Sequence, residues 1–182
     1  VQTCALPISP ALREFGVAPP NVGVMFDFQQ MYHVGVRVTD LDAAMAEYSA
    51  ALDVEWATVQ HSNSRGLWTP ERGGHTAELT FVYSKGGPQH IELLQGGSIW
   101  DCNGQPGLHH VGVWSQDVAA DVDAYLAAGW SLLAATKAPE DGYGTFAYVQ
   151  PPSGLIVELV AVAAKPRFDA WFAGGLMGQE RA

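Results

Sequence analysis

The feature that most constrains the fold of this chain is an internal repeat. Residues 31–36 read Met-Tyr-His-Val-Gly-Val, and residues 108–113 read Leu-His-His-Val-Gly-Val. When the two segments are aligned, residues that follow them also coincide: Asp40 with Asp117, Ala43 with Ala120, and Tyr48 with Tyr125. Such a repeat indicates two copies of one supersecondary unit, each with a histidine at the same point. It therefore predicts two half-sites that meet.

Each copy begins with a strand and a helix. Residues 32–38 alternate valines with other residues, the pattern of a half-buried strand, which leaves His33 and Arg37 on the face away from the valines. Thr39 or Asp40 then caps a helix that runs to about Leu52. The same pattern in the second copy predicts a strand over 110–115 and a helix that begins at Asp117.

Three further strands complete each copy. In the first copy they are expected at 54–60, 76–83 and 89–94, and the polar, glycine-containing stretch 62–74 is expected to be a mobile loop. In the second copy they are expected at 130–135, 145–150 and 155–162, with a loop at 137–144. The sequence thus predicts an α+β fold of two tandem β-α-β-β-β modules.

The predicted domain organisation follows from these patterns: an N-terminal extension at 1–30, a first module at 31–95, a linker at 96–107, a second module at 108–163 and a C-terminal tail at 164–182. Residues 1–8 also resemble a translated sequencing adapter, so the extension enters no functional argument. The tail contains Phe168, Trp171 and Phe172 and is too apolar for a free end. It is expected to pack on the sheet or on a partner subunit, which predicts a homodimer.

Composition excludes several classes of partner. The chain has nineteen acidic and nine basic residues, which gives a net charge of -10, and it has no cluster of Lys and Arg. Nucleic acid and anionic membranes are therefore unfavourable partners. The two cysteines are too few for a disulfide scaffold, and no apolar run is long enough for a transmembrane helix. We expect a cytoplasmic protein that acts on a small molecule.

Two His-Val-Gly-Val segments at the heads of tandem β-α-β-β-β modules resemble the vicinal oxygen chelate superfamily, which includes glyoxalase I, methylmalonyl-CoA epimerase, extradiol dioxygenases and bleomycin-resistance proteins. The resemblance spans residues 31–163 and implies a curved, eight-stranded mixed sheet around a metal site. The run 107–110 and the Pro-x-x-Gly-x-x-x-Glu pattern at 151–158 look most like the epimerase branch. In metal-binding members the ligands come from the first and last strands of both modules. Carried over to this sequence, that set is His33, Glu92, His110 and Glu158.

The residues themselves support this ligand set. Glu92 and Glu158 each lie between apolar residues of a strand, where a carboxylate faces solvent or a polar cavity, because a buried unpaired one would be costly. Two imidazoles and two carboxylates suit one divalent ion: zinc, nickel, cobalt, manganese or iron. His109 is the alternative to His110, but the register with His33 favours His110. Strand alternation is expected to turn His109 to the opposite face.

Two more residues are candidates for the site. Glu78 lies in an apolar strand, and the resemblance to methylmalonyl-CoA epimerases implies a catalytic base there; the alternative is an outward-facing strand glutamate. The candidate catalytic residues are therefore Glu78 and Glu158. His90 lies two residues before Glu92 and supports the ligands or simply ends a strand.

A divalent ion that binds a carbonyl or enolate oxygen acidifies the adjacent carbon, and a carboxylate of suitable pKa then moves the proton. We therefore expect a metal-dependent isomerase, epimerase or lyase that acts on a small carbonyl compound. An iron-dependent ring-cleaving dioxygenase is one alternative, although Glu92 would be surplus to its two-His, one-carboxylate site. A metal-free drug-binding protein of the resistance type is the other, with tryptophans that stack on the drug. Few basic residues are at hand for the phosphates of an acyl-CoA: Arg37, Arg65, Arg72 and Lys85.

Overall fold

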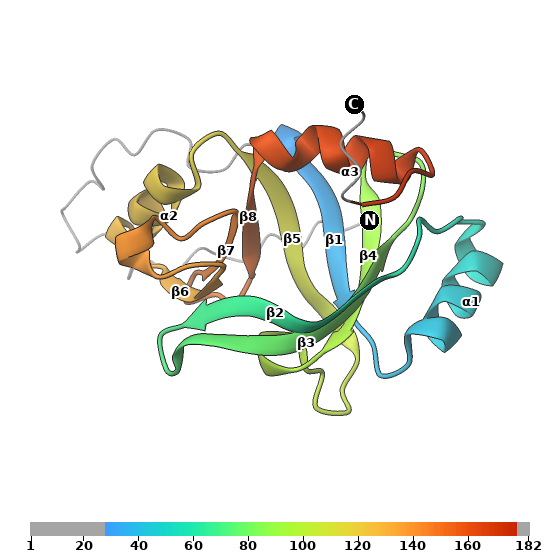
Figure 1. The fold of residues 1–182 in the computed structure, drawn as a ribbon, viewed down its shortest axis with the longest axis horizontal. Coiled ribbons are helices and arrows are strands. Elements are labelled where there is room, and N and C mark those ends of the chain that lie inside the picture. The colour runs from blue at the N-terminus through green and yellow to red at the C-terminus, as the bar shows by residue number, and fades with distance from the viewer. Residues whose placement is uncertain (1–27, 178–182) are drawn as a thin grey trace, which may run out of the picture.

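The computed structural model describes residues 28–177. Within this range eight strands form a closed barrel with the order β1-β4-β3-β2-β6-β7-β8-β5 (Figure 1). The strands are β1 (Met31–Arg37), β2 (Gln60–Thr69), β3 (Gly73–Tyr83), β4 (His90–Gly96), β5 (Gly107–Ser115), β6 (Ser131–Ala135), β7 (Phe146–Gln150) and β8 (Val157–Ala161). The α-helices are α1 (Leu41–Leu52), α2 (Val118–Ala127) and α3 (Lys165–Phe172). The predicted α+β fold with two tandem modules in a mixed eight-stranded sheet is confirmed.

The two modules meet at two places in the barrel. Each module pairs its first strand with its last strand in parallel, β1 with β4 and β5 with β8. The modules then join through β1 and β5, which run antiparallel along most of their length. On the far side they join through β2 and β6, where the one registered pair is Trp68 with Ala135.

The aligned aspartates begin both outer helices. The Asp40 carboxylate accepts a hydrogen bond from the Ala43 amide at 2.9 Å, and the Asp117 carboxylate accepts one from the Ala120 amide at 3.1 Å. These N-caps satisfy amides that have no partner within the helix. Helices α1 and α2 lie on the outer face of the barrel (Figure 1) and bury apolar residues such as Leu41 and Val122 against it. The predicted helix starts are confirmed.

The structure corrects the prediction for residues 54–74. The stretch 62–74, expected as a mobile loop, belongs to the hairpin of β2 and β3, with a turn at 70–72. Most of its polar side chains are exposed, whereas Leu67 and Thr69 are buried and Arg65 is half-buried. The prediction of a loop was wrong because a strand with one solvated face can be mostly polar. The strand expected at 54–60 is reduced to a single bridge between Trp56 and Ser84.

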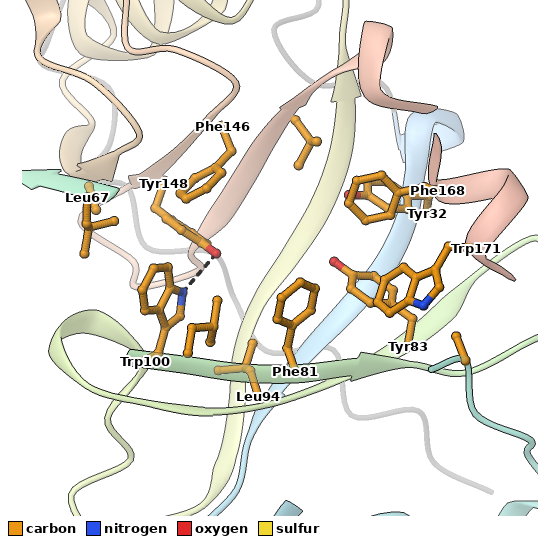
Figure 2. Close-up of a cluster of buried hydrophobic side chains, with 14 residues drawn as sticks. Tyr32, Leu67, Phe81, Tyr83, Leu94, Trp100, Phe146, Tyr148, Phe168 and Trp171 are labelled. Carbon is orange, nitrogen blue, oxygen red and sulfur yellow. Dashed lines mark hydrogen bonds between the residues drawn. The ribbon is translucent and has the colours of Figure 1, made fainter. Parts of the chain in front are cut away.

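The C-terminal tail packs on the barrel of its own chain. Helix α3 follows β8 through a 3-10 turn, η5 (Val162–Ala164), and lies across one end of the barrel (Figure 1). Phe168 and Trp171 join the aromatic residues Phe81 and Tyr83 inside it (Figure 2). The indole N–H of Trp171 donates to the carbonyl of Thr58 at 3.0 Å. Phe168 and Trp171, on which the prediction of a homodimer was based, are thus covered within the chain. The homodimer stays a prediction.

Three further 3-10 turns complete the description: η2 (Phe28–Gln30), η3 (Ser98–Trp100) and η4 (Pro139–Asp141). Residues 1–27 of the predicted N-terminal extension, including the adapter-like segment, lie outside the described residues. None of the helices between residues 28 and 177 combines the length and hydropathy that a membrane crossing requires.

Candidate metal centre

The four residues expected as metal ligands come together inside one chain. His33, Glu92, His110 and Glu158 are all buried, and one ligand atom of each lies within 4.8 Å of the others. The two Nε2 atoms of His33 and His110 are 2.7 Å apart. The Glu158 carboxylate is 3.2 Å from His33 and 3.3 Å from His110, and the Glu92 carboxylate is 3.2 Å from His110. The ligand quartet is thus complete without a second subunit.

Strand register explains why these four side chains converge. The strands that carry them, β4, β1, β5 and β8, are adjacent in the barrel. Gly35 of β1 pairs with Glu92 on one side and with His110 on the other. Gly112 of β5 pairs with His33 on one side and with Glu158 on the other. Side chains in register across neighbouring strands point to the same face, so all four point into the barrel.

The two glycines of the repeated motif make room for the histidines of the opposite module. A Cβ atom built on Gly35 would lie 2.7 Å from Nε2 of His110 and closer still to Cε1 and Nδ1 of that ring. A Cβ atom on Gly112 would collide in the same way with the ring of His33. The spacing His-Val-Gly therefore has a physical reason: the motif of each module supplies one histidine and the space for the histidine of the other module.

The donor set fits a divalent ion. Adjacent donors around an ion with bonds of about 2.1 Å lie about 3.0–3.4 Å apart. The separations that involve a histidine nitrogen run from 2.7 Å to 3.5 Å, and all four ligand atoms lie within 4.8 Å of one another. The Glu92 Oε2 atom is buried and has no partner with hydrogen-bond geometry. A buried carboxylate oxygen in that position is costly unless a cation neutralises it. His33, Glu92, His110 and Glu158 are therefore the residues that would hold the ion.

The charges of the centre are tightly coupled. Burial by itself would lower the pKa of His110, but the adjacent carboxylates of Glu158 and Glu92, 3.3 Å and 3.2 Å away, outweigh that effect and raise this pKa to about 9. Burial would raise the pKa of Glu158, yet the adjacent His110 and His33 lower it below its ordinary value. Burial would also raise the pKa of Glu92, and the same two histidines lower it. Both carboxylates are thus ionised at neutral pH, as metal ligands must be.

His109 was placed wrongly by strand alternation. Gly35 pairs with His110, but the next residue of β1 pairs with Leu108, so His109 is an extra residue in a β-bulge. Its Nδ1 atom lies 2.9 Å from Nδ1 of His110. Because Nε2 of His110 faces the centre, its Nδ1–H is free to donate to His109. Burial, followed by the nearby His110, lowers the pKa of His109 to about 3, so it is neutral and accepts this bond.

A small aromatic cavity adjoins the centre. Its volume is about 50 Å³, room for a few water molecules or one short ligand group. Glu92 and Glu158 line it, together with Tyr32, Tyr83 and Tyr148. The Tyr83 hydroxyl lies 3.5 Å from Nε2 of His33. Burial and the two carboxylates raise the pKa of all three tyrosines well above the ordinary value, so each hydroxyl keeps its proton. Sequence patterns gave no sign of these tyrosines.

The structure leaves two candidates away from the centre. Glu78 is exposed and lies beside Asp40 and Gln95 in a groove on the outer surface, whereas the next residue, Leu79, points into the barrel. This is the outward-facing alternative that strand alternation allows. The Nδ1–H of His90 donates to the Ser84 carbonyl, 2.7 Å away. The ring also stacks on Phe172, so His90 does not join the four candidate ligands.

Known structures share this fold at low sequence identity. A hypothetical protein from Bacillus halodurans (BH1468) superimposes with a TM-score of 0.53 and 16% identity, over 72% of this chain and 92% of that one. A methylmalonyl-CoA epimerase in complex with methylmalonyl-CoA and NH4+ gives 0.51 and 20%, over 74% and 95%. A mutant of 4-hydroxymandelate synthase from Streptomyces coelicolor gives 0.50 and 16%, over 72% of this chain and 47% of that one. These similarities establish the fold.

Sequence comparison places the chain in a family. No curated protein sequence matches it. The profile of the Glyoxalase/Bleomycin resistance protein/Dioxygenase superfamily matches residues 32–148, which is well over half of the chain. The match includes His33, Glu92 and His110, while Glu158 lies beyond it and joins them through β8. Fold, repeat and profile agree, and the chain belongs to the glyoxalase/bleomycin resistance/dioxygenase (vicinal oxygen chelate) superfamily.

Proposed function

We propose that this protein is a divalent-metal-dependent isomerase, epimerase or lyase that moves a proton next to the carbonyl group of a small compound. The observation that carries the proposal is the convergence of two imidazoles and two carboxylates at the wall of an aromatic cavity. The donor types suit a divalent ion of the borderline or hard class: zinc, nickel, cobalt, manganese or iron. When bound, such an ion supplies the Lewis acidity that polarises a carbonyl group and acidifies the C–H bond beside it.

Glu158 is the candidate base. Its carboxylate lines the cavity and hydrogen-bonds to His33 and His110, which keep it ionised. An ionised carboxylate beside the substrate accepts the proton from carbon and returns it to the same or the neighbouring atom. Glu92 lines the cavity too and offers a second carboxylate of the same kind. Glu78 takes no part, because its side chain is on the outer surface.

The tyrosines prepare the cavity for this chemistry. Their hydroxyl groups remain protonated and are therefore hydrogen-bond donors to a developing enolate oxygen. The Tyr148 hydroxyl is held by the indole N–H of Trp100 at 3.3 Å, which fixes its position (Figure 2). Phe168 and Trp171 close the end of the barrel and restrict water near the carboxylates. A substrate in this space meets donors, a base and few competing water molecules.

The second carboxylate favours proton transfer over the oxygenase alternative. A facial triad of two histidines and one carboxylate leaves sites for oxygen and substrate, whereas this centre offers two carboxylates. The drug-binding alternative receives little support from the tryptophans. Trp100 lines the cavity, but Trp114 stacks on Tyr32 and Trp130 packs on Tyr125.

The proposal is tested by proton exchange, which needs no prior choice of substrate. The protein loaded in turn with zinc, nickel, cobalt and manganese is incubated in D2O with a panel of 2-oxo acids, hydroxyketones and acyl thioesters. We expect metal-dependent deuterium incorporation at the carbon next to the carbonyl, measured by NMR, and no incorporation by the His110→Ala/Glu158→Ala double variant. Oxygen consumption by the iron-loaded protein without deuterium exchange would instead establish the oxygenase. A protein that binds none of these ions would contradict the metal centre itself.

A further inference from the structure

Two arginines line the same cavity as the metal centre. Arg65 comes from β2 and Arg167 from α3, so they approach from the first module and from the C-terminal helix. Neither forms an ion pair within residues 28–177, although the lysines at 85 and 165 do, with Glu55 and Asp169. In a chain with nineteen acidic and nine basic residues, two arginines at one cavity without an acidic partner stand out.

Each guanidinium group connects to one histidine of the centre through two aromatic rings. On one side, the ring of Tyr148 lies 5.2 Å from His110 and 5.6 Å from Phe146, and Arg65 lies 5.4 Å from Phe146. On the other side, the ring of Tyr32 lies 4.4 Å from His33 and 6.1 Å from Phe168, and Arg167 lies 5.9 Å from Phe168. Two aromatic rings thus separate each cation from the ligands, and Figure 2 shows the two pairs on opposite sides of the cluster.

We infer that the substrate is an anionic carbonyl compound, with its carbonyl end at the centre and a carboxylate or phosphate group at the cavity mouth between Arg65 and Arg167. This inference rests on the proposed function and specifies the substrate class. A net charge of -10 disfavours anions over most of the surface, so an anionic substrate needs cations at the entrance. Guanidinium groups bind carboxylate and phosphate with two parallel hydrogen bonds. Their contacts with Phe146 and Phe168 hold the cations beside the cavity.

The small volume of the cavity limits the part of the substrate between its two ends. About 50 Å³ accommodates a short chain and no second ring system. Arg65 is one of the basic residues that the sequence offers for an acyl-CoA. Arg167 is not among them, because the apolar tail predicts packing on the sheet or on a partner but not the path of α3 beside the cavity. Arg37 and Lys85, the other candidates with known partners, bind the Asp101 carbonyl and Glu55 instead.

The test uses chelating probes that differ at the far end alone. Hexanohydroxamic acid, adipic monohydroxamic acid and the ω-phosphonate of equal length all chelate a divalent ion through the hydroxamate group. Their affinities for the zinc-loaded protein are measured by isothermal titration calorimetry. We expect at least one anionic probe to bind about tenfold more tightly than the neutral one. The Arg65→Met/Arg167→Met double variant should lose that difference, and Arg72→Met, in the exposed turn between β2 and β3, should retain it. The better anion identifies carboxylate or phosphate as the recognised group.

The outcomes separate this inference from the proposed function. If all three probes bind equally well, or if the double variant keeps the preference, the anion site is wrong while the metal centre stands. If the loaded protein binds no hydroxamate at all, the accessible metal centre is wrong and the inference fails with it. Metal content of each variant, measured by elemental analysis, shows that the arginine substitutions leave the four ligands intact.

Discussion

The reciprocal packing of glycine and histidine makes a sharp prediction for Gly35→Ala. The added Cβ would lie 2.7 Å from Nε2 of His110, whereas ordinary contacts begin at 3.4 Å, so that atom must move by about 0.7 Å. The Cε1 and Nδ1 atoms of the ring, which are closer to the Cβ, must move farther. The ring is completely buried and wedged between strands, so it has no open space to enter.

This displacement should reduce both stability and metal binding. Overpacking of a filled core costs about 1–3 kcal/mol of the free energy of unfolding. For a domain of this size that lowers the Tm by about 2–12 °C. Metal–ligand bonds tolerate errors of about 0.2 Å, so a displaced His110 should be lost as a ligand. We expect a metal affinity at least 100-fold weaker than that of the unmodified protein.

The assay is thermal unfolding in the presence of a chelator, followed by competition for zinc with a chromophoric chelator. Gly66→Ala is the matched control, because a Cβ there meets nothing within 4 Å and the residue is also in a strand. If Gly35→Ala unfolds at the same temperature as Gly66→Ala and binds zinc equally well, the reciprocal packing is not what the motif glycine provides. Gly112→Ala should behave like Gly35→Ala, through His33.

Three further predictions concern the neighbours, the pH response and the tail. His109→Leu removes the acceptor for Nδ1–H of His110 and should weaken zinc binding about 10- to 100-fold in the competition assay. An unchanged zinc affinity would show that this hydrogen bond does not support the metal centre. Because the pKa of His110 is raised to about 9 and an ion displaces that proton, zinc affinity measured by calorimetry should rise about tenfold per pH unit up to about pH 9. For the same reason the metal-free protein should be most stable between about pH 4.5, above which both carboxylates contribute, and about pH 6.5, and should lose stability as the pH rises toward 9. Urea midpoints that rise between pH 6.5 and 9 would contradict the assignment. Trp171→Ala should lower the free energy of unfolding in urea by about 3–5 kcal/mol, because the side chain is 0% exposed. Leu176, which is 53% exposed, gives the control variant Leu176→Ala. An equal loss in the two variants would show that the tail is not part of the core.

The convergence of the four candidate ligands could be predicted from the sequence because all four residues lie on strands of a repeat. The period of two fixes which side chains share a face, and the repeat shows which positions of the two modules correspond. The alignment of the two modules therefore indicated His33 and His110 together. The two glutamates were predicted from the family resemblance and from their apolar neighbours. The helix N-caps Asp40 and Asp117 could also be predicted, because an N-cap depends on the residues next to it in the sequence.

What escaped prediction depends on contacts between distant segments. The bulge that brings His109 to His110 arises from the pairing of β5 with β1, and the residues of β5 alone do not predict it. The polar strand β2 was taken for a loop because one of its faces is solvated along most of its length. Arg167 reaches the cavity because α3 lies across the barrel, a path that the periodicity of the tail does not specify.

The uneven closure of the barrel has a consequence for access to the centre. A closed sheet opens first where its hydrogen-bond ladder is shortest, and here that is the contact of β2 with β6, with its one registered pair. The ligands lie on the opposite wall, in the continuous series β4-β1-β5-β8. Separation of β2 from β6 would therefore widen the interior of the barrel. The two modules would rotate about the β1–β5 pair, and the four donor atoms would stay in place. Amide exchange should be fastest along that narrow seam and slowest along the hinge.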